Sequence, residues 1–246
     1  TAMLFGLIMR GVAFEFRFKS SSRRHVWDTF FFVGSVVATF SQGIMLGALV
    51  QGLEASNRLY TGGPFDWLTP FSIVCGFAMI IGYALLGSTW LIIKTEHTLQ
   101  VWARQVSRWM LTALLVAMIV VTAFMYFSDI DALEGWFSFP DLLYLAPMPI
   151  IVMLLFFIMR KDLKTEREYR PFLLTVALFL MGYIGVCFAL FPYIVPYQMT
   201  IYEAAAADTS LSFMLIGACI MLPIILSYTA FAYYTFKGKS DHNPMY

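Results

Sequence analysis

Residues 67–93 read WLTPFSIVCGFAMIIGYALLGSTWLII, and this stretch contains no charged side chain. It is longer than the ~17–25 apolar residues that a helix needs to cross a bilayer. Five further apolar blocks occupy residues 27–52, 109–127, 143–159, 171–195 and 209–236, and residues 1–9 form a partial seventh. The sequence therefore predicts an all-α, polytopic transmembrane helix bundle that forms one domain over residues 1–246, with six complete spans and the end of one more.

The composition agrees with a membrane protein. The chain is 60% hydrophobic and 13% charged, with a mean hydropathy of +0.76, which excludes an ordinary soluble domain. Because the chain begins at Thr1 inside an apolar run, we expect the outer part of one helix to be missing upstream.

Fifteen of the sixteen basic residues lie in every second connection between the apolar blocks. They are Arg10, Arg17, Lys19, Arg23 and Arg24, then Lys94, Arg104 and Arg108, then Arg160, Lys161, Lys164, Arg167 and Arg170, and finally Lys237 and Lys239. Short basic connections remain in the cytoplasm, so these connections and the C-terminus are predicted to be cytoplasmic. Since topology accounts for the basic residues, they do not indicate nucleic-acid binding.

The histidines argue against a haem or metal ligand in this chain. His25, His97 and His242 all lie in basic connections, whereas a haem inside the membrane needs a histidine or another strong ligand there. The three cysteines fall in different spans with no CxxC spacing, which is typical of small apolar residues. No hydrolase or phosphate-loop motif is present. We therefore assign no catalytic residue and no metal site.

Ionisable groups inside a membrane mark ion paths, and no carboxylate falls in the middle of a predicted span. Arg10 and Glu15, at the cytoplasmic end of the partial helix, are the best candidates for a proton entry path. Five residues separate them, so they need not face each other. The alternative, an anchoring arginine beside a solvated acid, stays open.

Small residues and prolines predict local features of the spans. Gly43 and Gly47 form a GxxxG motif with Ala48 alongside, which predicts close packing against a neighbouring helix. Five prolines predict kinks or unwound turns, namely Pro70, Pro147, Pro149, Pro192 and Pro223.

Two longer stretches are more specific. The first runs from RGVAFEFR at 10–17 to WD at 27–28 and QG at 42–43. The second runs from FDWLTPF at 65–71 through GYALLGSTW at 82–90 to KTE at 94–96, and FPY at 191–193 and LPIILSYTA at 222–230 follow. In this order they closely resemble subunit II of the cytochrome bd-type quinol oxidases, including the cyanide-insensitive branch, over essentially the whole chain.

The resemblance implies a fold of eight transmembrane helices, of which this chain has the last six and the cytoplasmic end of the second. About ninety residues at the N-terminus of the family pattern are absent, and with them the family's acidic and Trp-rich motifs. The basic connections agree with the orientation of the family.

The resemblance also implies a function. The chain would belong to a heterodimeric terminal oxidase of a bacterial plasma membrane that oxidises quinol and reduces dioxygen to water. Subunit I would carry the haem b and haem d-type groups, and this chain would support it and contribute to proton delivery. Arg10 and Glu15 match a basic residue and an acid of the family, where some members have Asp at the position of Glu15. Quinol, membrane lipids and a small accessory subunit are the other expected partners.

Two other functions are compatible with a helical membrane protein. A stand-alone transporter or channel would need broken helices in corresponding positions of two halves, with polar groups at mid-membrane. Pro147 with Pro149, and Pro192 with Pro196, are the nearest candidates for such breaks. The other alternative is a structural subunit of a different respiratory complex.

Overall fold

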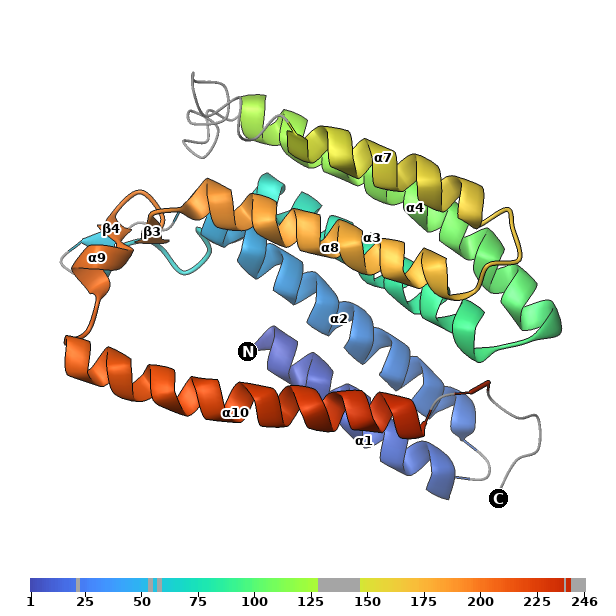
Figure 1. Ribbon diagram of the computed structural model, residues 1–246. Coiled ribbons are helices and arrows are strands. Elements are labelled where there is room, and N and C mark those ends of the chain that lie inside the picture. The colour runs from blue at the N-terminus through green and yellow to red at the C-terminus, as the bar shows by residue number, and fades with distance from the viewer. Residues whose placement is uncertain (21–22, 53–54, 57–58, 128–146, 237, 240–246) are drawn as a thin grey trace.

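Long helices run back and forth through the computed structural model of the chain, which describes residues 1–20, 23–52, 55–56, 59–127, 147–236 and 238–239 (Figure 1). The helices are α1 (Ala2–Lys19), α2 (Arg24–Gln51), α3 (Pro70–Lys94), α4 (His97–Phe127), α7 (Pro147–Asp162), α8 (Tyr169–Leu190), α9 (Ile201–Ala204) and α10 (Asp208–Thr235). Two antiparallel hairpins pair β1 (Ala55–Ser56) with β2 (Leu59–Tyr60), and β3 (Tyr193–Val195) with β4 (Met199–Thr200). The predicted all-α bundle is confirmed.

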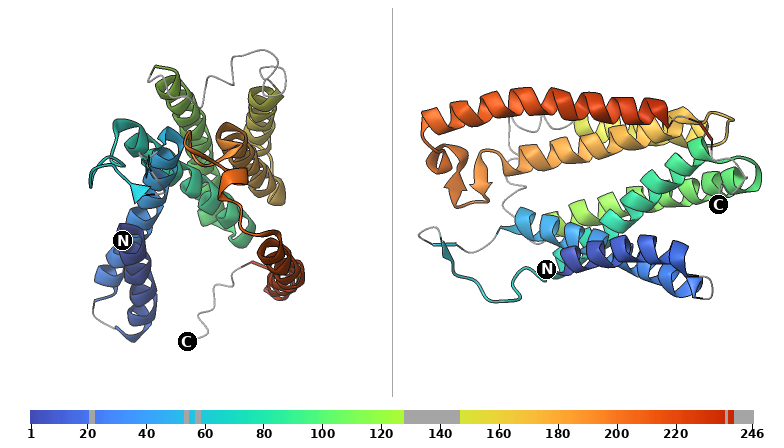
Figure 2. Two further views of the ribbon diagram at one scale, coloured as in Figure 1. Left: turned by 90° about the vertical axis from the view of Figure 1, so that its left-hand side faces the viewer. Right: turned by 90° about the horizontal axis from the view of Figure 1, so that it is seen from below.

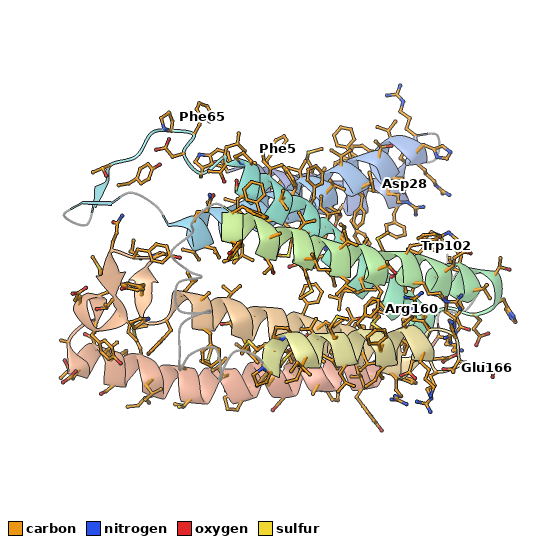
Figure 3. The ribbon with its side chains drawn as sticks, turned by 90° about the horizontal axis from the view of Figure 1, so that it is seen from above. Phe5, Asp28, Phe65, Trp102, Arg160 and Glu166 are labelled. Atoms are coloured by element: carbon orange, nitrogen blue, oxygen red, sulfur yellow. The ribbon has the colours of Figure 1, made fainter. Side chains whose placement is uncertain are left out.

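The α1–α2, α3–α4 and α7–α8 connections lie together at one end of the bundle, which we call the basic end, and both hairpins lie at the opposite end (Figure 1). Asp28, Trp102, Arg160 and Glu166 are at the basic end, whereas Phe65 is at the other (Figure 3). The basic connections therefore share one end, as their alternation along the sequence predicts.

Among the described helices, α2, α3, α4, α8 and α10 are long and apolar enough to cross a membrane. Helix α7 has 16 residues, fewer than the ~17–25 that a span requires. Its predicted span began at residue 143, and residues 143–146 lie outside the described part of the chain.

Three helices end or begin at other residues than the predicted spans. Helix α1 continues to Lys19 instead of ending at residue 9, and α4 begins at His97 instead of 109. An apolar run marks the part of a helix that sits in lipid, while the helix itself can continue into water with charged side chains. Helix α8 ends at Leu190 instead of 195, just before the cis peptide bond between Phe191 and Pro192. Proline has no N–H to continue a helix, and it disfavours helical conformation in the residue before it.

The prediction for Pro70 also needs correction, because this proline starts a helix instead of bending one. Thr69 caps α3, its hydroxyl accepts a hydrogen bond from the Ser72 backbone N–H at 3.0 Å, and the Ser72 side chain completes a capping box. Proline suits the first turn, where its missing N–H would have no partner. Pro147 and Pro149 likewise fall in the first turn of α7, and Pro223 lies inside the continuous helix α10.

Glycines bring α1, α2 and α3 into close contact. A Cβ atom on Gly43 would lie 2.6 Å from the Cys75 carbonyl oxygen, and one on Gly47 would lie 2.7 Å from the Ser72 Cα. The predicted packing role of the GxxxG motif is therefore confirmed, with α3 as the neighbour. Gly6 and Gly34 play the same part between α1 and α2, since a Cβ on either would lie 2.7 Å from the carbonyl oxygen of the other.

Helices α3, α4, α7 and α8 enclose the main apolar core. Its fully buried members include Leu85 and Ile92 from α3, Ala103 from α4 and Met159 from α7. Helix α10 differs, because none of its 28 residues is buried and it stands apart along most of its length (Figure 2).

Candidate functional site

Arg10 lies in the middle of α1, on the side that faces α2. Its guanidinium carbon is 5.6 Å from the centre of the Phe31 ring, within the distance of a cation–π contact. Gly6, one turn earlier on the same side, contacts Gly34 and Ala38 of α2. Arg10 is therefore positioned by the close α1–α2 contact, although its side chain remains exposed.

Glu15 lies on the opposite side of α1. It follows Gly6 by nine residues, which is two and a half turns of an α-helix, so it points away from α2. Leu4 and Ile8 share this outward face and are 58% and 62% exposed. Among the described residues no ion pair involves Glu15. The structure thus places both candidate residues on α1 and does not bring them together.

Sequence reasoning missed an ion pair that fixes the basic end of α1. The Arg17 Nε lies 2.5 Å from the Asp28 carboxylate of α2, and both side chains are 46% exposed. Stacking of Phe16 on Trp27, with ring centres 5.1 Å apart, adds a second contact between the same segments. An arginine and an aspartate eleven residues apart across a turn carry no specific sequence signal, so only the fold identifies the pair.

A second charged group surrounds Asp162, the last residue of α7. This carboxylate is buried, with Arg167 Nη1 at 3.3 Å and Arg170 Nε at 3.2 Å. Arg104 and Arg108 of α4 donate hydrogen bonds to backbone carbonyls of the same connection, at Thr165, Arg167 and Leu163. Four cations thus hold the short α7–α8 connection in one conformation, and a buried charge with two partners fits that structural role.

A third group ties α10 to the rest of the protein. The Lys94 Nζ donates to the carbonyl oxygens of Phe236 at 2.8 Å and Gly238 at 3.1 Å. The Lys239 Nζ donates to Glu168 at 2.7 Å and lies 3.5 Å from Glu96. The hydrogen bond from Lys239 lowers the pKa of Glu168, and the same bond raises the pKa of Lys239. The pair therefore remains charged over a wide pH range.

Buried hydroxyl pairs supply the polar contacts inside the four-helix core. Ser107 of α4 donates to Ser88 of α3 at 2.9 Å, and Thr89 of α3 lies 3.4 Å from Thr175 of α8. Ser88, Thr89 and Thr175 each donate their hydroxyl proton to a carbonyl of their own helix. Since these groups are neutral and satisfied, they pack helices together and offer no charge to an ion path.

The two described histidines lie at helix ends. His25 lies in the first turn of α2, and His97 is the exposed first residue of α4. Neither can reach an iron in the middle of a span, and His242 lies outside the described residues. No group of three His, Cys, Asp or Glu side chains within the described ranges is arranged to hold a metal ion.

The prolines considered for a transporter lie at the ends of the described helices or beyond them. Pro147 and Pro149 start α7, whereas Pro192 and Pro196 follow the end of α8. Within the described residues, Pro192 and Pro196 therefore do not interrupt a helix.

Together these features define a multi-pass helical membrane protein whose described ion pairs lie at one end. The family model for cytochrome bd terminal oxidase subunit II matches residues 1–236, and the chain belongs to this family. Members of the family are subunits of an oxidoreductase complex that contains haem. The resemblance inferred from the sequence motifs is confirmed.

Three curated proteins show the same similarity. "Probable cytochrome oxidase subunit 2" of Haemophilus influenzae is 26% identical over 98% of this chain and 73% of its own length. "Cytochrome bd ubiquinol oxidase subunit 2" of Bacillus subtilis is 24% identical over 98% and 72%. "Cytochrome bd-I ubiquinol oxidase subunit 2" of Escherichia coli K12 is 25% identical over 96% and 72%.

Proposed function

We propose that the chain is subunit II of a bd-type terminal oxidase in a bacterial plasma membrane, where the complex oxidises quinol and reduces dioxygen to water. The observation that carries the proposal is the family match over residues 1–236. The names of the Bacillus and Escherichia relatives, both ubiquinol oxidase subunits, favour quinol as the electron donor. The proposal also includes an orientation in the membrane, in which the basic end and the C-terminus face the cytoplasm.

The partner in this proposal is a subunit I that carries the haem b and haem d-type groups. The positions of His25 and His97 at helix ends favour that division of labour, because a haem iron needs a strong axial ligand within reach. The large apolar surface of α1 and α10 fits a second set of transmembrane helices. Lipids and a small accessory subunit would complete the assembly.

Within this complex, Glu15 and Arg10 would serve proton uptake. A carboxylate at the basic end can bind a proton from water and release it toward the interior, and Glu15 lies on the outward face of α1, where a partner helix can pack. Arg10 would contribute a fixed positive charge on the α2 side. The two residues therefore act from opposite faces of one helix.

Absorption spectra of the purified protein test the division of labour. Haem bands should appear when subunit I co-purifies with this chain and be absent when this chain is purified alone. Haem retained by the isolated chain would contradict the proposal.

Oxygen consumption of the purified oxidase tests the proton role. We expect Glu15→Gln and Arg10→Ala to lower turnover roughly tenfold or more while haem content is preserved, since losing a general acid or base typically costs ~10²–10⁴ in rate. Glu166→Gln is the matched control, because Glu166 is an exposed acid at the same end of the molecule. Unchanged turnover in both α1 variants would remove these residues from the proton path.

A further inference from the structure

One face of α7 is apolar and exposed along the whole helix. Ile150, Leu154 and Phe157 are 68%, 57% and 57% exposed, whereas Phe156 and Met159 on the other side are buried in the four-helix core. Exposed apolar side chains at this helical spacing form a continuous stripe along α7. This stripe suits contact with hydrocarbon chains.

Three cationic residues lie next to the apolar stripe, at the basic end of α7. Arg160, Lys161 and Lys164 follow Phe157 at intervals of three, four and seven residues, which keeps them on the same face. The helical turn extends past Asp162, because the Leu163 N–H bonds to the Met159 carbonyl at 2.9 Å. All three cationic side chains are exposed.

These three charges differ from the other cations nearby. Arg104 and Arg108 are committed to backbone carbonyls, and Arg167 and Arg170 to Asp162. In the part of the chain that the structure describes, no ion pair involves Arg160, Lys161 or Lys164.

The acids around the three cations do not neutralise them. Asp162 is buried with its two arginines, and Glu168 binds Lys239. Glu166 is the remaining acid of the α7–α8 connection, and it is exposed. An excess of positive charge therefore lies at the end of the apolar stripe.

We propose that this face of α7 binds an anionic phospholipid of the leaflet at the basic end, with its phosphodiester on Arg160, Lys161 and Lys164. An acyl chain lies along Ile150, Leu154 and Phe157. A lipid can contact both the unpaired cations and the apolar stripe next to them. A free anion can contact only the cations, so the site favours a lipid. It also selects an anionic headgroup over a zwitterionic one.

The expected strength follows from the number of charges. A lysine or arginine near an anionic membrane surface contributes a factor of about five in affinity, so the three together contribute on the order of a hundredfold. Each single substitution to glutamine should therefore weaken binding about fivefold.

Titration of the delipidated oxidase complex with short-chain phosphatidylglycerol, followed by native mass spectrometry, tests the site. We expect Arg160→Gln/Lys161→Gln/Lys164→Gln to lower the affinity by at least tenfold, with phosphatidylcholine binding weakly to both proteins. Haem content and the melting temperature of each variant report whether the complex is intact. Should the triple variant fail to assemble, the three single variants test the same prediction.

The matched control is Lys19→Gln/Arg23→Gln/Arg24→Gln, which removes the same net charge from the α1–α2 connection. Its affinity for phosphatidylglycerol should change less than twofold. An equal loss in both triple variants would show general attraction by net charge and overturn the proposed site. Full displacement of the lipid by millimolar inorganic phosphate would overturn the lipid in favour of a free-anion site.

Discussion

At the scale of single residues, α2 makes its close contacts at glycines, which have no side chain. Gly43 and Gly47 let the backbones of α2 and α3 approach until a Cβ atom would lie 2.6–2.7 Å from backbone atoms. Small residues at helix interfaces allow this approach in membranes, where association depends on van der Waals contact. The sequence motif predicted the contact but could not name its partner, because GxxxG carries no information about the opposing helix.

Gly43→Ala should destabilise the protein, because the added methyl group meets the Cys75 carbonyl and the backbone of Gly76, which cannot rotate away. Overpacking of this kind costs about 1–3 kcal/mol. The melting temperature of the detergent-solubilised protein measures the effect. Gly87→Ala is the matched control in α3, since a Cβ there has no atom within 4 Å. A similar loss in both variants would contradict the packing account.

The Ser88–Ser107 hydrogen bond should contribute little more than other interhelical bonds in membranes. We expect Ser107→Ala to cost about 0.6 kcal/mol and at most about 1.7 kcal/mol. Ser88 keeps its bond to the Leu85 carbonyl, so no buried hydroxyl is left unsatisfied. A double-mutant cycle with Ser88→Ala and thermal unfolding measures the coupling. A coupling free energy of several kcal/mol would contradict this expectation and show that the hydrogen bond is a major source of stability.

Arg10 and Glu15 show where sequence reasoning ends at this scale. Their separation of five residues predicted that they need not face each other, and the structure puts them on different sides of α1. Which side meets α2 depends on Gly6 and Gly34 coming together, and that is a tertiary contact between two helices. The Arg17–Asp28 pair was missed for the same reason.

At the scale of elements, apolar runs located the helices well and their ends poorly. The run at 109–127 identified α4, but the helix begins at His97 because Gln100, Arg104 and Arg108 form bonds with neighbouring segments and remain helical. Hydropathy measures immersion in lipid, whereas helix ends depend on caps and partners. At Thr69-Pro70 the local sequence contains the start signal of the helix itself.

The stabilisation from the Glu168–Lys239 pair, which attaches the end of α10 to the core, should decrease both in acid and at high pH. The pKa of Glu168 is lowered from 4.5 by its bond with Lys239, so the stabilisation is present above the unfolded-state value and is lost as the pH falls through the folded-state value. The pKa of Lys239 is raised from 10.5, so its part is present below that value and is lost as the pH rises through the higher folded-state value.

The melting temperature from pH 3.5 to 8 measures this dependence. In the wild-type protein, the contribution of the Lys239–Glu168 pair to the melting temperature should be constant between about pH 6 and 8. This contribution should be lost below pH 4.5. Glu168→Gln should be slightly less stable at pH 7 and converge with the wild type in acid. A constant difference between the two proteins across the whole range would rule out the ion pair as the cause.

At the scale of the whole molecule, one simple pattern has the largest consequence. Alternation of basic connections gave the up-and-down order of the helices, and the structure gathers those connections at one end (Figure 1). The sequence could not give the lateral arrangement, because helices in lipid are apolar all round and the pattern does not distinguish a face toward lipid from one toward protein. Helix α10 is the extreme case, with no buried residue.

Labelling of intact cells with a membrane-impermeant maleimide tests the proposed orientation. In a background without the three native cysteines, Thr61→Cys at the hairpin end should react and Lys164→Cys at the basic end should react only after permeabilisation. The reverse pattern would invert the orientation. Reaction at both ends in sealed cells would show that the membrane barrier was not intact in the assay.

The single-ended attachment of α10 bears on how the protein is made. Helices α1, α2 and α3 pack on their neighbours in sequence, so each can find its partner as soon as it has left the ribosome and entered the bilayer. The bonds that hold α10 join Lys94 to Phe236 and Glu168 to Lys239, just beyond the C-terminal end of the helix. Docking of α10 must therefore wait until residues 236–239 have been synthesised, and α10 remains free to diffuse beside the bundle until then.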